Sequence, residues 1–359
     1  MKSIESYYNG IIKDCKKWIY WDYNDNLIDE IKRIIPDFTS MYTDEKVQDL
    51  IEKLLHAGQK SQGSLADNIQ SLANDRKRHI ISLFFLGHIL YDNIDIIKEM
   101  VDKQIVNLNF PEQNEQMNVE KIFSFMWILL CLFHDLGYDY EEGKKEIERA
   151  NSLETIYSDL TKEFIPPIYN IDNVKKHDKY RLCKWGVKDH GIWGGKVFFN
   201  DMSQIKNLLR QTEGIVNTMF CSDGIEHIYA FAAWIIICHN LRYDSGVSPY
   251  SNCFKCQGLD DFIKPKARCI SLQSNPLLFL FCLADTLEPT KILKSCCGNK
   301  ESMNICKLLE LDFTGNILSF NLENLSDYKA GDEYKKAILS MNDWLIDVNT
   351  NDLSIVFGK

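Results

Sequence analysis

Residues 122–138 read IFSFMWILLCLFHDLGY, an apolar run that stops abruptly at a histidine and an aspartate, His134 and Asp135. Similar apolar segments recur between about residues 70 and 295; they carry few turn residues and are too long for ordinary strands. They are also too short to cross a bilayer, which takes about 20 residues. The stretch therefore predicts a mostly helical fold with buried core helices.

Other apolar runs of this region also carry residues that can bind a metal. YAFAAWIIIC is followed by His239, PLLFLFCLA is followed by Asp285, and IISLFFLG lies between His79 and His88. A buried carboxylate is costly unless it is paired or bound to a cation, and apart from His134 no basic residue lies within two turns upstream of either aspartate. A shared cation is an economical explanation.

Each histidine alone would more often be a hydrogen-bonded core or surface residue, so the hypothesis rests on the whole set. His79 and His88 are nine positions apart, which places them on opposite helix faces, and only one of them is expected to point inward. We favour His79, which follows a basic cluster. His56 and His177 are expected at the surface, and His227 is a weaker ligand candidate.

Five motifs occur in a fixed order along the chain: RKRHIISLFFLG, LFHDLGYD, KDHGIWGG, ICHN and LADTLEPTK. This order resembles that of the HD-domain superfamily of metal-dependent phosphohydrolases, and the resemblance spans roughly residues 76–291. HDLGY after an apolar run is the most specific motif, while RxxH and ICHN are weak alone. The spacer between the second and third motifs is longer than in compact versions of that fold.

The resemblance implies a site with two metal ions. One ion would be held by four residues, His79, His134, Asp135 and Asp285. Asp135 would bridge to a second ion held by His190 and His239, since a carboxylate has two oxygens and can span two cations. Imidazole and carboxylate together suit divalent manganese, iron, nickel or zinc, with magnesium as an alternative, and they argue against a pure calcium site.

Charged residues near the motifs supply further candidates. We assign a catalytic role to Asp135, Lys188 and Asp189, and substrate binding to Arg76, Arg78 and Lys291. Lys188, Asp189 and Lys291 could each orient a ligand, act as a general acid or contact phosphate. The basic cluster could equally be a solvated helix start. Gly191, Gly194 and Gly195 either allow close backbone approach beside the metals or form a plain turn.

Three parts are expected along the chain. Residues 1–70 would be a helical lead-in, residues 71–295 the metal-dependent phosphohydrolase domain, and residues 296–359 a C-terminal α+β extension. A hairpin is predicted in the extension, where LLELDF and ILSFNLE flank a Thr-Gly-Asn turn. The segment LSIVFGK predicts a third strand, and DEYKKAILSMNDWL predicts a helix.

The net charge of −10 and the pI near 5.4 argue against binding that depends on a nucleic-acid backbone and favour a small-molecule substrate. The resemblance implies that this molecule is a phosphate ester or nucleotide. No apolar leader opens the sequence and no run suits a membrane, so we expect a cytoplasmic protein. Its twelve cysteines are expected to be reduced. Cys253 and Cys256 could form a zinc site only if the fold joins them to Cys296 and Cys297.

Three functions follow from the resemblance. The leading hypothesis is hydrolysis of a phosphate ester or anhydride in a nucleotide or cyclic-nucleotide-like molecule. A mixed-valent di-iron oxygenase is the first alternative, because such enzymes use the same order of six ligands. A non-enzymatic nucleotide sensor is the second, and the presence of all six ligands argues against it.

Overall fold

Helices dominate the computed structural model, in which 72% of the described residues are helical, as predicted. The described residues are 1–11, 74–108, 119–141, 153–160, 165, 167–213, 225–241, 251–262, 270–294, 307–325, 329–351 and 353–358. The predicted lead-in over residues 1–70 lies mostly outside them.

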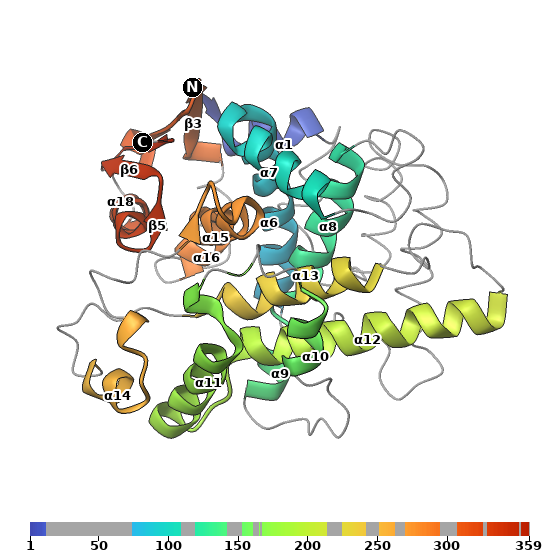
Figure 1. Cartoon of the computed structure of the whole chain (residues 1–359). Helices are drawn as coiled ribbons and strands as arrows, with labels where there is room; N and C mark the ends of the chain where they lie inside the picture. The colour runs from blue at the N-terminus through green and yellow to red at the C-terminus, as the bar shows by residue number, and fades with distance from the viewer. Residues whose placement is uncertain are drawn as a thin grey trace. The chain divides into compact units, whose positions relative to one another are not determined.

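The chain divides into two compact units, each assembled from separate stretches of sequence. Unit 1 comprises Met1–Asp25, Ala73–Val101 and Ala267–Lys359, and unit 2 comprises Asn26–Leu72 and Asp102–Lys266. Figure 1 labels most of the helices and some of the strands of both units. Each unit is described by itself below.

Unit 1 is built on a long helix, α6 (Asn74–Asn93), against which α15 (Pro276–Leu287) packs. Pro276 is the first residue of α15, where its missing N–H costs nothing. Almost every residue of α15 is buried, which matches its unbroken apolar sequence. The short helices α1 (Ile4–Ile11) and α16 (Pro289–Lys294) also contact α6, and α7 (Asp95–Asn107) contributes residues to both units.

A five-stranded antiparallel sheet completes unit 1, in the order β1-β3-β4-β7-β6. Its strands are β1 (Lys2–Ser3), β3 (Glu310–Thr314), β4 (Ile317–Asn321), β6 (Val348–Asn351) and β7 (Ser354–Phe357), and a separate parallel pair joins β2 (Ile270–Ser271) to β5 (Leu345–Ile346). The predicted hairpin is β3–β4, turning at Gly315 with φ of 59°. The predicted third strand and helix are β7 and α18 (Lys329–Ser340).

Unit 2 is helical in its described part. Its helices are α8 (Val119–Phe133), α9 (Tyr138–Glu141), α10 (Leu153–Ser158), α11 (Ile171–Trp185), α12 (His190–Glu213), α13 (Ile225–Cys238) and α14 (Ser251–Cys256). The long helix α12 lies alongside α13, as Figure 1 shows. Helix α11 has clear end signals: the Asn170 side chain accepts a hydrogen bond from the Asn173 N–H, and Gly186 ends the helix with φ of 68°.

Two glycines of unit 2 allow backbones to approach closely. A Cβ on Gly137, just after α8, would lie 1.7 Å from the carbonyl oxygen of His190. A Cβ on Gly195, in α12, would lie 2.5 Å from the carbonyl oxygen of Ala233 in α13. Because no side chain fits at either place, the end of α8, the start of α12 and the helix α13 come together only with glycine there. This confirms the predicted close approach at Gly195.

A search of the described residues for a helix with both the length and the apolar character of a membrane span finds none.

Candidate metal centre

Three predicted ligands of unit 2 converge on one point. Asp135 follows α8, His190 begins α12, and His239 follows α13. Each offers one ligand atom, and these atoms lie within 4.8 Å of one another. Asp135 is 5% exposed and His190 is 4% exposed, so the group is largely screened from water. Two imidazoles and one carboxylate form a donor set that suits a divalent transition metal.

Backbone hydrogen bonds orient two histidines of unit 2. Nδ1 of His134 donates to the carbonyl oxygen of Cys131 at 3.0 Å, and Nδ1 of His239 donates to that of Ile236 at 2.5 Å. Each bond fixes the tautomer with Nε2 unprotonated, which is the form that binds a metal. His134 Nε2 also lies 3.4 Å from Asp135 Oδ1.

His190 is held by contacts around its ring. The ring of Tyr138 stacks on it at 3.8 Å between centroids, and the side-chain amide of Asn240 lies 3.3 Å from Nδ1. Glu141 Oε1 lies 3.9 Å from the same nitrogen. Burial raises the pKa of Glu141, but His190 and Arg181 outweigh it and hold that pKa below its ordinary value.

Behind His190, a buried carboxylate ties three elements together. Asp189 is fully buried; its Oδ2 accepts a hydrogen bond from Asn240 Nδ2 at 3.0 Å and lies 3.6 Å from Arg181 Nε. Its Oδ1 accepts from the Ile192 N–H at 3.1 Å, which caps the first turn of α12. Asn240, which also lies 3.3 Å from His190 Nδ1, links this carboxylate to the His190 ring.

The expectation that His177 lies at the surface is wrong. His177 is fully buried, with Nδ1 3.6 Å from Asp189 Oδ2 and its ring near those of Phe254 and Phe262. Its sequence neighbours are polar because the outer face of α11 is solvated, while position 177 falls on the inner face. His56 lies outside the described residues.

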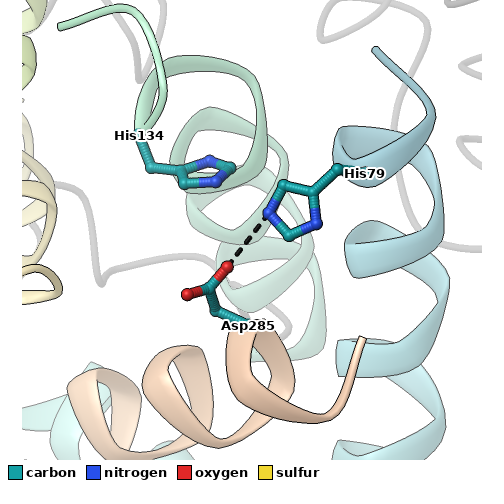
Figure 2. A group of neighbouring side chains, drawn as sticks. All are labelled: His79, His134 and Asp285. Atoms are coloured by element: carbon teal, nitrogen blue, oxygen red, sulfur yellow. Dashed lines mark ion pairs between the residues drawn. The ribbon is translucent and has the colours of Figure 1, made fainter. Parts of the chain in front are cut away.

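In unit 1, two further predicted ligands meet. His79 of α6 and Asp285 of α15 are 7% and 8% exposed, and Nε2 of His79 lies 3.0 Å from Oδ1 of Asp285. Figure 2 shows this ion pair as a dashed line. His134 belongs to unit 2, so its place in the same ligand set stays a prediction from the sequence.

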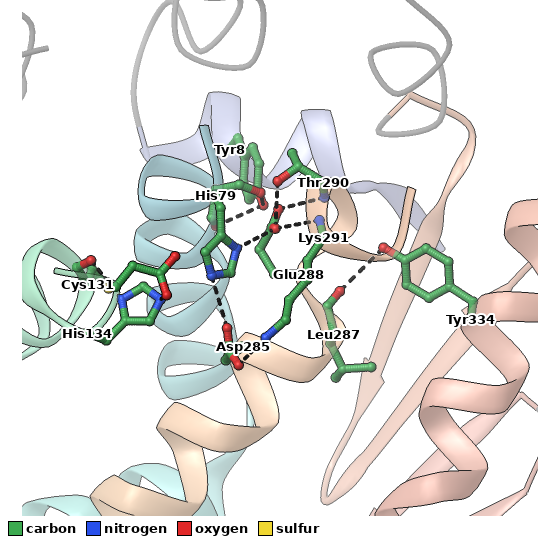
Figure 3. Close-up of polar contacts among 12 residues, drawn as sticks. Tyr8, His79, Cys131, His134, Asp285, Leu287, Glu288, Thr290, Lys291 and Tyr334 are labelled. Atoms are coloured by element: carbon green, nitrogen blue, oxygen red, sulfur yellow. Dashed lines mark hydrogen bonds and ion pairs between the residues drawn. The ribbon is translucent and has the colours of Figure 1, made fainter. Parts of the chain in front are cut away.

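Glu288, to which the sequence assigned no role, contacts the other side of the His79 ring in unit 1. Nδ1 of His79 donates to Oε2 of Glu288 at 2.7 Å, and Glu288 is fully buried (Figure 3). Burial lowers the pKa of His79, but the hydrogen bonds to Asp285 and Glu288 outweigh it and raise the pKa to about 10. Two buried carboxylates around one imidazole thus favour a positive charge at this place, which a proton or a metal ion can supply.

Of His79 and His88, it is His79 that lies against Asp285. The expectation that only one of the two points inward is wrong, because His88 is also buried, at 2% exposure. It packs edge-on against Phe84, and burial lowers its pKa to about 3. His88 is therefore a neutral core residue. His227 is exposed and its Nδ1 donates to the carbonyl oxygen of Asp159.

The predicted phosphate-binding residues have different surroundings. Lys291 pairs with Asp285 Oδ2, and its side chain is 52% exposed. Lys188 extends over the ring of Trp193, with Nζ 4.2 Å from the centroid. The side chains of Arg76 and Arg78, at the start of α6, lie outside the described part of the chain, as do Cys296 and Cys297. Cys253 and Cys256 lie on α14.

Comparisons of the chain with protein-family models, with curated proteins and with solved structures each gave no match.

Proposed function

We propose that this chain is a metal-dependent phosphohydrolase of the HD-domain type, acting on a phosphate ester or anhydride of a nucleotide-like small molecule. The observation that carries the proposal is the convergence of buried Asp135 and His190 with partly buried His239 from three helix ends. The pair of His79 and Asp285 adds two ligands of the kinds that the motif order requires.

The ligand residues would divide between two metal ions, with Asp135 shared by both. Asp135, His190 and His239 would hold one ion. Asp135 would also contribute to the second, with His79, Asp285 and, by its place in the HDLGY motif, His134. A carboxylate is the natural bridge, since it has two oxygens and an imidazole offers one nitrogen at a time. When bound, the two cations would supply positive charge that polarises the phosphoryl group and acidifies the attacking water.

The protein's own groups would prepare the site for that chemistry. Backbone carbonyls accept from Nδ1 of His134 and His239, so the neutral form of each ring presents Nε2 to a metal without a change of tautomer. Burial of Asp135 and His190 excludes bulk water, which strengthens the attraction between the donors and a cation.

Two lysines are the candidates for holding phosphate. Lys291 is half exposed beside Asp285, and its chain can turn from that carboxylate to an incoming phosphate oxygen. Lys188 lies two positions before His190, with Nζ over Trp193. The net charge of −10 agrees with a small substrate, since a long nucleic acid would call for an extended basic surface.

Elemental analysis of the purified protein, before and after loading with Mn²⁺, tests the metal site first. Wild type should hold about two ions, and a double variant, His134→Ala with Asp135→Ala, should lose both. His227→Gln, which changes an exposed histidine outside the motifs, is the matched control and should keep both. Release of phosphate or nucleoside is then measured on nucleoside mono- and triphosphates and cyclic dinucleotides.

Three results would contradict the proposal. Loaded wild type that binds no metal would leave a helical protein without this mechanism. Two bound iron ions with oxygen uptake and no phosphate release would favour the oxygenase. Tight nucleotide binding without turnover under any metal would favour the sensor.

A further inference from the structure

Glu288 lies between α15 and α16 and receives several hydrogen bonds from buried or partly buried donors. Its Oε1 accepts from the Thr290 N–H at 2.8 Å. Its Oε2 accepts from the Lys291 N–H at 2.9 Å, from the Thr290 hydroxyl at 2.7 Å and from His79 Nδ1 at 2.7 Å. Figure 3 shows these contacts converging on one carboxylate.

The bonds to Thr290 and Lys291 identify Glu288 as the N-terminal cap of α16. That helix begins at Pro289, so Glu288 satisfies the N–H groups of its second and third residues. Serine, threonine, aspartate and asparagine are the usual residues at a cap. A glutamate is one methylene longer than the cap requires, and that additional length lets the carboxylate also reach His79.

The bond to His79 has a chemical consequence at the other side of the ring. A carboxylate only accepts hydrogen bonds, so Nδ1 must carry a proton. Nε2, which faces Asp285 at 3.0 Å, is then the nitrogen that would exchange its proton for a metal ion. Asp285 is itself held from behind by Lys291, the third residue of the same helix α16. The start of α16 therefore contacts both ligands of unit 1.

We infer that Glu288 is a positioning residue for metal binding: it fixes the tautomer and the orientation of His79 while capping α16. That the bound ligand is a metal ion rests on the proposed function. That Glu288 positions His79 rests on the hydrogen bonds of Glu288 alone. The cap couples the two tasks, because a shift in α16 moves Glu288 and Lys291 together and so moves both His79 and Asp285.

Two variants separate the cap from the contact with His79. Glu288→Asp keeps the charge and a good cap but withdraws the carboxylate by one methylene from the ring. Glu288→Gln keeps the length, but its NH₂ group must face either His79 Nδ1 or the Thr290 N–H, both of which are donors. Glu333→Gln, on the exposed side of α18, is the matched control.

The first readout is the metal-free protein labelled with ¹⁵N-histidine. Wild type should show a downfield, slowly exchanging Nδ1–H signal for His79, identified by its absence in His79→Gln. Glu288→Asp should lose this signal while its thermal unfolding remains within a few degrees of wild type. Glu288→Gln should weaken or shift it, because one of its two amide orientations turns the NH₂ group toward the ring, and Glu333→Gln should keep it.

The second readout is the equilibrium binding of Mn²⁺. The ion in the set with His79 should bind about 10- to 100-fold more weakly in both Glu288 variants, while the ion held by His190 and His239 is unaffected. A His79 signal that persists in Glu288→Asp overturns the inference, whatever the metal content. If Glu288→Asp loses that signal but wild type binds no metal, the positioning role is supported and the proposed function is rejected.

Discussion

The ligands of unit 1 and those of unit 2 are positioned by different means. In unit 1, His79 and Asp285 are oriented by side chains, Glu288 and Lys291, that reach them from the start of α16. In unit 2, backbones in direct contact at Gly137 and Gly195 set the ligand positions, and main-chain carbonyls orient two histidines. Ligand placement in unit 1 should therefore be sensitive to the loss of single polar atoms, and that in unit 2 to an increase in side-chain volume at the glycines.

The largest expected effect comes from the residue that the proposal shares between both ligand sets. Asp135→Asn keeps the shape of the side chain but removes the negative charge that a bridging ligand needs. We expect loss of both Mn²⁺ ions and a fall in phosphate release of at least roughly 1,000-fold. Metal content and turnover are measured on the same preparation. A variant that loses one ion and keeps the other would show that Asp135 is not shared.

Gly137→Ala tests whether backbone contact positions the ligands of unit 2. The new methyl group would overlap the carbonyl oxygen of His190, so Asp135 and His190 must move apart. We expect a loss of about 4 kcal/mol or more in the free energy of unfolding, measured by urea denaturation. The control is Gly331→Ala in α18, where the nearest atom would be 3.4 Å away, and it should be neutral or mildly stabilising. Equal stabilities for the two variants would refute the contact.

Arg181→Met tests the charged network behind His190. The guanidinium pairs with Glu141 and lies 3.6 Å from the buried carboxylate of Asp189. Without the guanidinium, less positive charge balances the buried negative charge of Asp189. We expect the free energy of unfolding to fall by about 3 kcal/mol. Adding Asp189→Asn to this variant should recover part of the loss, which urea denaturation of the double variant checks. No recovery would mean that the arginine acts through packing alone.

The smallest effect concerns a carboxylate on α12 outside the metal set. Burial raises the pKa of Asp201 to about 6, although Asn200 hydrogen-bonds to it. The folded state therefore holds a proton that the unfolded chain releases near pH 3.8, so the contribution to stability is present below that pH and is lost as pH rises through 6.

Asp201→Asn should accordingly be more stable than wild type by about 1–3 kcal/mol at pH 8 and equal to it near pH 4. Denaturation curves at both pH values check this. An equal gain in stability at pH 4 and pH 8 would mean that the effect comes from packing and not from charge. The metal content of Asp201→Asn should equal that of wild type, because Asp201 lies on α12 but outside the metal set.

Much of the fold could be predicted because helices and hairpins leave local signals. The apolar runs gave α8, α13 and α15, and alternating residues around Gly315 gave β3–β4. The convergence of Asp135, His190 and His239 followed from motif order by resemblance. Glu288 could not be assigned, since its partner His79 lies 209 positions away, and the one local signal was a glutamate placed just before Pro289. His177 was misjudged because its sequence neighbours face water and it does not.

The discontinuous make-up of unit 1 has a consequence for biosynthesis. Helix α6, with His79, leaves the ribosome long before α15 and α16, which carry Asp285 and Glu288, and before β3, with which β1 pairs. Unit 2 is translated in full while unit 1 still lacks its last stretch, Ala267–Lys359. The face of α6 that packs against α15 therefore lacks that partner until residues 276–287 have been synthesised. A stalled or truncated chain would have the means to assemble the ligands of unit 2 but never those of unit 1.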